Sequence, residues 1–195
     1  MLRQIILASQ SKQRFNILKT LNLDFEVMPA YLDEKLIQAD SEPERAKKVA
    51  QAKAEAVAQD YPEAIIIAAD TYGFLDRQAL EKPENLEEAR EMLRLMSGQK
   101  IIALTGFCYL DQKNQIEEVL VKQTECVFRK LYPEEIEDYV QTEPVLTWSA
   151  AFCPAYIKGM SLVAEVNGPF TAFTHGLPIE EVTRCLEKSG VFTDK

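Results

Sequence analysis

Histidine, paired cysteines and long apolar runs are scarce in this chain of 195 residues. His175 is the only histidine, which excludes a metal centre built from several histidines and disfavours a Ser-His catalytic triad. The four cysteines lie far apart and form no CxxC pair, so the sequence predicts neither a zinc site nor a disulfide framework. Three of them lie in apolar runs, where we expect them to be small buried hydrophobic residues.

Positive charge is also in deficit. The 22 Lys and Arg residues are outnumbered by 31 Asp and Glu, which gives a net charge of −9. A field of this sign repels long polyanions, so we expect no nucleic-acid polymer as a partner, but it does not exclude a small polyphosphate. The first apolar run, Ile5-Ile6-Leu7, is too short for a signal peptide or a membrane span. We therefore expect a cytoplasmic chain with no membrane partner.

The apolar patterning predicts a chain of mixed strands and helices. The hydrophobic content of 47% is enough for a substantial core, in one domain or in two closely packed lobes. Expected strands are 5–8, 25–27, 64–69, 101–110, 117–128, 161–166 and 170–174, the last two as a hairpin. Expected helices follow residue 11, run from Ser41 to about Gln59 and from Asn85 to about Ser97, begin near Tyr132, and cover 179–188. Hairpin and crossover connections together predict the α/β class with a mixed sheet.

A turn rich in hydroxyl groups and cations follows the first expected strand. Ser9, Ser11, Lys12 and Arg14 lie where that strand gives way to a helix. Free backbone N–H groups and the positive end of the helix dipole meet there, which suits a phosphate. The alternative is that Ser11 only caps the helix while the two cations lie in solvent.

Two further residues stand out because their charge conflicts with their position. Lys53 falls on the inward stripe of the 41–59 helix, so it either extends to the edge of the apolar face or has a specific role. Asp70 follows the continuously apolar run 64–69, and ligand crevices in open α/β sheets lie at the carboxyl ends of central strands. The alternative for Asp70 is an ordinary turn or cap residue. Lys82 and the pair Asp33-Glu34 are weak signals when taken alone.

Taken in order and spacing, these segments resemble the Maf family. The matching segments span nearly the whole chain and are Leu7-Ala8-Ser9-Gln10-Ser11 with Arg14, Asp33-Glu34, Ala52-Lys53-Ala54, Ala69-Asp70-Thr71, Glu81-Lys82-Pro83, Ser97-Gly98, Thr105-Gly106, Phe128-Arg129, Glu134-Glu135-Ile136, Glu143-Pro144 and Gly176-Leu177-Pro178. Neither a Walker loop nor a GxGxxG motif is present, so the common nucleotide-binding fingerprints are absent.

The resemblance implies one Maf-like domain over residues 1–195, with a Maf/ITPase-like fold of two lobes around an extended mixed β-sheet, a central cleft, and assembly as a homodimer. It also implies hydrolysis of standard or modified nucleoside triphosphates to monophosphate and pyrophosphate, with Mg²⁺ or Mn²⁺. Carried across by position, phosphate would be bound by Ser9, Ser11, Lys12 and Arg14. Glu34 and Asp70 would hold the metal. The catalytic residues would be Asp70, Lys53 and Lys82.

Two departures from the family pattern bear on substrate and activity. The usual Ser-Pro-Arg-Arg reads Ser11-Lys12-Gln13-Arg14 here, and Lys12 offers no bidentate fork. The usual Ala-Gly-small-aromatic stretch reads Ser149-Ala150-Ala151-Phe152, with Ala155 where a Gln or Glu is normal. The alternative hypothesis is therefore a nucleotide-binding, weakly active or inactive regulator of cell division or septation.

The base is predicted from the same region of the chain. The loop between Gly168 and Gly176 and the segment 149–155 lack the pattern of the family branch that acts on pyrimidine triphosphates. The seven residues between those glycines, and Tyr61-Pro62 before the expected central strand, resemble the branch that acts on 7-methyl-GTP. Trp148, Phe152 and Tyr156 would offer aromatic faces to a cationic methylated guanine. The alternative is that these rings fill the core.

Overall fold

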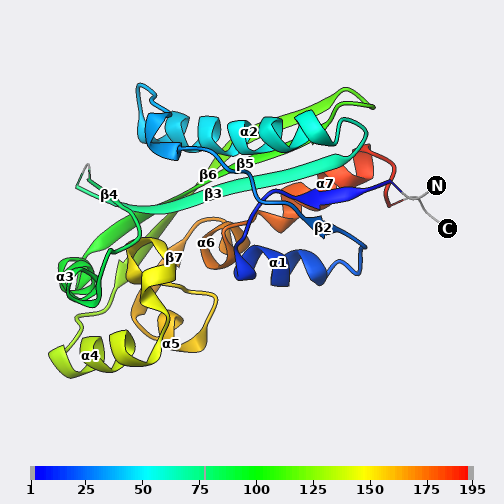
Figure 1. Cartoon of the computed structure of the whole chain (residues 1–195). Helices are drawn as coiled ribbons and strands as arrows, with labels where there is room; N and C mark the ends of the chain where they lie inside the picture. The colour runs from blue at the N-terminus through cyan, green and yellow to red at the C-terminus, as the bar shows by residue number, and fades with distance from the viewer. Residues whose placement is uncertain (1–2, 77, 193–195) are drawn as a thin grey trace. The chain divides into compact units, whose positions relative to one another are not determined.

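The computed structural model describes residues 3–76 and 78–192 (Figure 1). Its strands form one mixed sheet in the order β2-β1-β3-β5-β6-β7, with β4 paired to β3 off this path. The strands are β1 Ile5–Leu7, β2 Glu26–Val27, β3 Ile65–Leu75, β4 Gln78–Leu80, β5 Lys100–Asp111, β6 Ile116–Phe128 and β7 Val163–Asn167. Pairing of β1 with β2 and β3 is parallel, and pairing of β3 with β4 and of β6 with β7 is antiparallel. The predicted α/β class with a mixed sheet is confirmed.

The helices begin where the sequence supplies caps. Ser41 Oγ accepts a hydrogen bond from Glu44 N at 3.4 Å, and Asn85 Oδ1 accepts from two backbone N–H groups at 3.0 Å. The helices are α1 Lys12–Lys19, α2 Glu42–Asp60, α3 Leu86–Met96, α4 Pro133–Thr142, α5 Ile157–Met160, α6 Phe170–His175 and α7 Ile179–Lys188, with 3-10 turns η1 Glu34–Leu36, η2 Val145–Thr147 and η3 Ser149–Ala151. Within the described ranges, no helix is long and apolar enough to cross a bilayer.

The chain divides into two compact units, and the first carries the parallel part of the sheet. It comprises the residues up to Asp70, Thr105–Lys122 and those from His175 onward. Alternate residues of β1 and β3 face opposite sides, so Ile6 and Ile66 pack on α2 whereas Leu7 and Ile67 pack with α1 and α7. Figure 1 shows α2 on one side of these strands and α1 and α7 on the other. Both faces are covered, which explains the continuously apolar sequence of 64–69.

One glycine fixes how closely α2 approaches the sheet. A Cβ atom at Gly106, on β5, would lie 1.9 Å from the carbonyl oxygen of Ala46 on α2. No side chain fits at that distance, so only glycine allows the helix backbone to lie directly on the strand. This contact positions every side chain that α2 directs toward the sheet.

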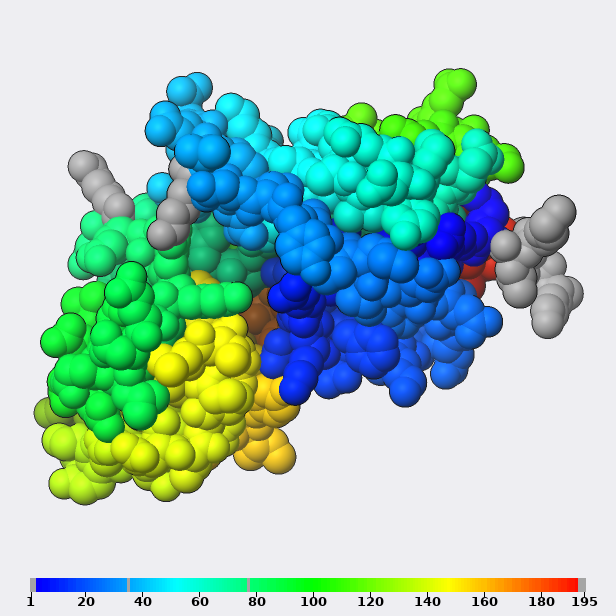
Figure 2. All heavy atoms as spheres, in the orientation of Figure 1, coloured from blue at the N-terminus to red at the C-terminus, as the bar shows by residue number. Residues whose placement is uncertain are grey.

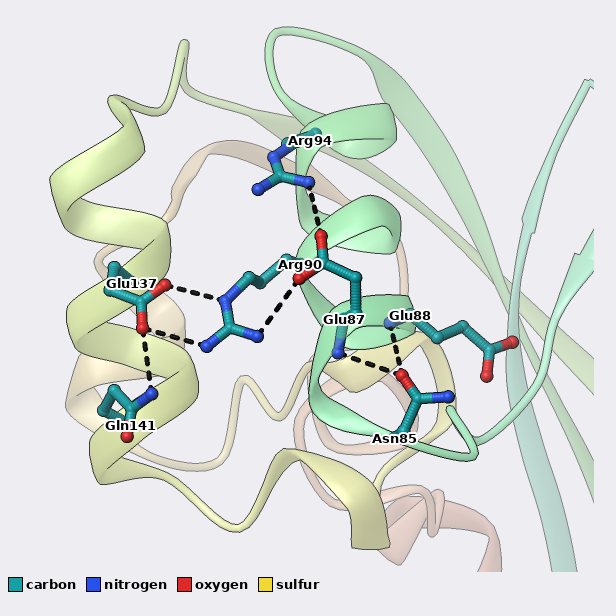
Figure 3. A network of polar contacts seen from close by, with 7 residues as sticks. All are labelled: Asn85, Glu87, Glu88, Arg90, Arg94, Glu137 and Gln141. Atoms are coloured by element: carbon teal, nitrogen blue, oxygen red, sulfur yellow. Dashed lines mark hydrogen bonds and ion pairs between the residues drawn. The ribbon is translucent and has the colours of Figure 1, made fainter.

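The second unit comprises Thr71–Leu104 and Gln123–Thr174 and has its own apolar core. In this unit α3 and α4 are joined by an ion pair that lies between them, part of a larger polar network (Figure 3). Arg90 donates to both carboxylate oxygens of Glu137, at 2.7 and 2.9 Å, while Glu87 accepts from Arg90 and Arg94. The bidentate pair fixes the relative rotation of the two helices.

The predicted hairpin of 161–166 and 170–174 is wrong in its second half. Residues Phe170–His175 form helix α6, in which the Phe173 N–H donates to Pro169 O at 3.1 Å. Proline has the φ of a first helical turn and lacks an N–H for a strand ladder, so Pro169 directs the chain into a helix. Strand β7 instead pairs with β6, with Val166 opposite Cys126.

All four cysteines are buried and unpaired, which confirms the burial expected for three of them. Burial raises the pKa of the Cys108 and Cys126 thiols to about 12, which leaves them protonated at neutral pH. They therefore act as packing residues.

Candidate functional site

Lys53 and two acidic residues form a cluster in the first unit. The Lys53 Nζ atom lies 2.8 Å from Asp70 Oδ1 and 2.8 Å from Glu34 Oε1. Lys53 is only 8% exposed, so its ammonium group does not extend into solvent. The explanation that Lys53 merely extends to the edge of the apolar face is wrong, since its charge is held by two carboxylates.

The periods of the two elements bring Lys53 and Asp70 together. Lys53 lies on the stripe of α2 that also buries Ala46, Ala50 and Ala54. Asp70 follows Ile66 and Ala68 at two-residue spacing, and those residues contact the α2 side of the sheet. A helix of period 3.6 and a strand of period 2 therefore place a cation opposite an acid.

The expectation that Asp70 ends its strand is wrong, because β3 continues to Leu75. The aromatic residues after Thr71 suit a strand, and the segment pairs with β4, which the sequence analysis missed. However, the parallel neighbour β1 ends at Leu7, opposite Ile67. Asp70 thus still lies beyond the carboxyl end of a parallel strand.

Glu34 is held by backbone contacts of its loop. Arg45, on α2, donates to the carbonyl oxygens of Glu34 at 3.4 Å and of Ile37 at 3.3 Å, and Lys48 donates to Gln38 O at 3.2 Å. Figure 2 shows this loop, in blue, on the surface beside the start of α2. The Glu34 side chain is 44% exposed, so a ligand can reach its carboxylate from solvent.

The turn from β1 to α1 is organised around Arg14. Ser11 is the N-cap of α1 and accepts from Arg14 N at 3.3 Å, as its capping alternative predicts. Ser9 Oγ accepts from Arg14 Nη1 at 2.9 Å, and Arg14 Nε donates to Gly176 O at 2.9 Å. Lys12 is exposed at the start of the helix. The structure therefore brings Ser9, Ser11 and Arg14 together at one helix N-terminus.

Arg14 is also electrostatically coupled to the acids. Burial lowers the pKa of Arg14, and the negative charges of Asp70 and Glu34 act in the opposite direction. An arginine remains charged at neutral pH in such surroundings because its ordinary pKa is above about 12. The first unit thus holds two cations, Arg14 and Lys53, around two carboxylates. His175, whose pKa burial lowers, contributes no charge at neutral pH.

The carboxylates fit a metal that arrives with a phosphate ligand. The described residues contain no group of three or more His, Cys, Asp or Glu that could hold a metal ion. Glu34 and Asp70 do approach one cation, Lys53, from two sides. Mg²⁺ is commonly held by one or two carboxylates together with substrate phosphates and water, so this donor set suits a metal–nucleotide complex.

Lys82 belongs to the second unit, between β4 and α3. It is exposed, and the Pro83 that follows it is buried. The two carbonyl groups that precede it are both hydrogen-bonded: Leu80 O accepts from Ser149 Oγ at 2.6 Å and Glu81 O from Ala150 N at 2.9 Å. The phosphate-binding role of Lys82 stays a prediction.

The expectation of three aromatic faces for the base is wrong for two of the rings. Trp148 and Phe152 are buried in the core of the second unit, where Phe152 packs on Phe128 at 4.8 Å between ring centroids. Tyr156 is 38% exposed and lies against Trp148 at 5.5 Å. Core filling accounts for the two buried rings, and only Tyr156 keeps an accessible face.

Sequence reasoning missed two parts of this site. Arg45 was not singled out, since an arginine in an amphipathic helix has no distinguishing pattern. The carbonyl of Gly176 was not assigned either, although its glycine is a signal: Gly176 has φ 66°, the left-handed conformation expected just after a helix.

Comparison with protein families places the whole chain. A family model described as Maf-like protein matches residues 4–189. The dTTP/UTP pyrophosphatase of Syntrophus aciditrophicus (strain SB) is 32% identical over 192 residues, 97% of this chain and 92% of that protein. A 7-methyl-GTP pyrophosphatase of Xanthomonas campestris pv. campestris (strain 8004) is 34% identical over 191 residues, 97% and 98% of the two chains.

Solved structures share the fold at low sequence identity. The Ham1 protein of Staphylococcus aureus matches with a TM-score of 0.54 at 14% identity, over 96% of this chain and 100% of that chain. A HAM1 protein from Coxiella burnetii matches with a TM-score of 0.51 at 14% identity, over 95% and 99%. These similarities concern the fold alone.

Proposed function

We propose that this chain, which belongs to the Maf-like protein family, hydrolyses nucleoside triphosphates to a nucleoside monophosphate and pyrophosphate. The observation that carries the proposal is the pairing of Lys53 with both Asp70 and Glu34, beside the Arg14 turn. Two carboxylates and two cations in one place can bind a metal–triphosphate complex, which carries both signs of charge.

Each residue has a defined task in this reaction. Glu34 and Asp70 would hold Mg²⁺ or Mn²⁺, which when bound makes coordinated water more acidic and offsets phosphate charge. Asp70 would accept the proton of the water that attacks the α-phosphorus. The bond from that phosphorus to the bridging oxygen breaks, and pyrophosphate leaves with the electron pair.

The cations would bind the charge that builds on the leaving group. Lys53 would turn from the carboxylates to a phosphate oxygen, and Arg14, held by Ser9 and Gly176, would offer a pre-oriented fork. Ser11 and Lys12 would contact phosphate at the start of α1. Lys82 is included through the family resemblance, as is the treatment of residues 1–195 as one functional domain.

A homodimer and a cytoplasmic location belong to the same proposal. Both rest on the family resemblance and on the expected role in nucleotide metabolism.

The alternative function is a nucleotide-binding regulator with little or no turnover. It is favoured by the altered segment Ser149–Ala155, in which Ala150 has φ 57°, a conformation better suited to glycine. Retention of Lys53, Asp70 and Glu34 in one cluster favours the enzyme.

Separating the two requires measurement of products. We expect the purified chain with Mg²⁺ or Mn²⁺ to convert triphosphates to monophosphate and pyrophosphate. Chromatography identifies the monophosphate, and a coupled assay measures the pyrophosphate. A chelator should abolish turnover. Release of orthophosphate, or an unchanged rate in chelator, would contradict the pyrophosphatase, and nucleotide binding without turnover would support the regulator.

A further inference from the structure

Ser149 and Ala150 hold the chain immediately before Lys82. Ser149 Oγ donates to Leu80 O at 2.6 Å, and Ala150 N donates to Glu81 O at 2.9 Å. Both contacts lie within the second unit and join segments about 70 residues apart in sequence. The residues just before Lys82 are therefore fixed by a turn that belongs to a distant part of the chain.

This turn has an unusual backbone. Ala150 has φ 57° and Ala151 has φ 53°, so two consecutive residues with side chains adopt the left-handed conformation. A left-handed pair persists only where the surroundings hold it, and such conformations concentrate at functional positions. In this turn the Ala150 N–H donates to Glu81 O, so the left-handed residues and the contact to the segment before Lys82 occur together.

A glycine on β3 leaves space for this turn, and a proline restricts the chain after Lys82. Gly73, on β3, is opposite Leu80 in the β3–β4 ladder, and a Cβ atom at Gly73 would lie 3.3 Å from the Ala150 Cβ atom. The glycine therefore leaves room for Ala150 above the hairpin. On the other side of Lys82, the ring of the buried Pro83 fixes its own φ and restricts Lys82.

We infer that Ser149, together with the left-handed turn at Ala150, is a positioning element for Lys82. It touches no reacting atom and acts by holding the carbonyl groups of residues 80 and 81, so that the backbone from which the Lys82 side chain extends keeps one position. Such pre-orientation matters for a flexible lysine, whose side chain otherwise loses rotational freedom when it binds phosphate. The inference rests on the proposed pyrophosphatase function and on the role of Lys82 in it.

A double-mutant cycle tests the inference. Ser149→Ala should lower kcat about fivefold with little change in KM, because one hydrogen bond that fixes the segment is lost. Ser149→Thr, which keeps the hydroxyl group, should restore most of the rate. Ser149→Ala is then made in the Lys82→Met variant, and the rate is measured under single-turnover conditions. There, Ser149→Ala should cause no further loss of rate.

A matched control and a measurement without turnover complete the design. Ser161→Ala removes a similar bond, from Ser161 Oγ to Lys158 O at 2.8 Å, on the surface of the same unit, and should leave kcat unchanged. Amide hydrogen exchange at residues 80–82 and 84 should accelerate in Ser149→Ala and not in Ser161→Ala.

The outcomes separate the two levels of the proposal. Multiplicative losses in the Ser149→Ala, Lys82→Met double variant, or unchanged amide exchange at residues 80–82 and 84, would contradict the positioning role while leaving the pyrophosphatase intact. A wild-type chain with no pyrophosphatase activity would contradict the proposed function itself.

Discussion

Lys53 and Asp70 lie 17 residues apart in the sequence, yet the lysine ammonium donates to the aspartate carboxylate at 2.8 Å. Glu34 approaches the same ammonium at 2.8 Å, so the lysine stands where a cation bound by the two acids would be. Lys53 therefore balances the charge that the metal of the proposed reaction would balance. This relationship governs the first predictions.

Asp70→Asn should lower kcat by roughly 10²-fold or more, since an amide neither accepts the proton of water nor binds a metal as a carboxylate does. The amide can still accept a hydrogen bond from Lys53, so the fold should persist. Steady-state kinetics and circular dichroism measure the two effects. Asp76→Asn is the matched control, because Asp76 is exposed and lies in the turn directly after β3. Near-normal turnover of Asp70→Asn would return Asp70 to a purely structural role.

Lys53→Met should lower kcat/KM by roughly 10²-fold through loss of charge stabilisation on the phosphates. Methionine keeps the apolar stem, whereas Asp70 loses its charged partner, so we expect a loss of about 1–3 kcal/mol in the free energy of unfolding. Urea denaturation gives the stability, and Lys47→Met, on the same helix, is the control. If activity is unchanged while stability falls, Lys53 serves only to neutralise the acids.

Metal and nucleotide should bind cooperatively. Without nucleotide, Lys53 competes with a metal for Asp70 and Glu34; a triphosphate offers the lysine another partner. Calorimetric titration with Mn²⁺ should therefore show at least about tenfold tighter binding in the presence of an α,β-methylene triphosphate analogue, a coupling of ~1.4 kcal/mol. Lys53→Met should raise the affinity for Mn²⁺ in the absence of nucleotide. Equal affinities for Mn²⁺ with and without the analogue, and in the wild type and Lys53→Met alike, would contradict competition between Lys53 and the metal.

The base preference is tested by a panel of triphosphates. From the sequence pattern we expect kcat/KM for 7-methyl-GTP to exceed that for UTP or dTTP about tenfold, equivalent to ~1.4 kcal/mol. Percentage identity does not decide the question, because relatives named dTTP/UTP pyrophosphatase match at 30% to 37% identity and one named 7-methyl-GTP pyrophosphatase matches at 34%. Tyr156→Ala should reduce the preference if that ring faces the base. Faster turnover of UTP or dTTP would refute the choice of base and leave the reaction unchanged.

Gly106→Ala should be more damaging than an alanine at a glycine with open surroundings. The added Cβ atom would lie 1.9 Å from Ala46 O, and displacing α2 should cost about 1–3 kcal/mol in the free energy of unfolding. Gly98→Ala meets no atom within 4 Å and should cost only its strain at φ 70°, roughly 1 kcal/mol. Because α2 carries Lys53, we expect Gly106→Ala also to lower kcat/KM, which Gly98→Ala should not do.

Much of the fold follows from local signals in the sequence. Ser41 and Asn85 cap helices as predicted, and the closing helix Ile179–Lys188 has the predicted bounds. The failures occur where a proline or a pairing with another strand overrides a local pattern. Pro169 converts an apparent strand into α6, and pairing with β4 extends β3 beyond Asp70.

The site was predictable only in part for a related reason. Side chains on regular elements can be assigned to a face by period, so Lys53 and Asp70 could be identified. Contacts to backbone carbonyls, such as Arg14 to Gly176 and Ser149 to Leu80, depend on where distant loops come to rest. No periodicity in the sequence encodes them.

The division of the first unit among three stretches of chain has a consequence for synthesis on the ribosome. Its core needs Leu177, Val182 and Leu186 from the final stretch to cover Ile5, Leu7 and Ile67 from the first. On this face of the sheet, the nascent chain therefore has only α1 to cover the strand pair until α7 has been synthesised. Until then, the incomplete sheet exposes apolar surface of the kind that chaperones bind.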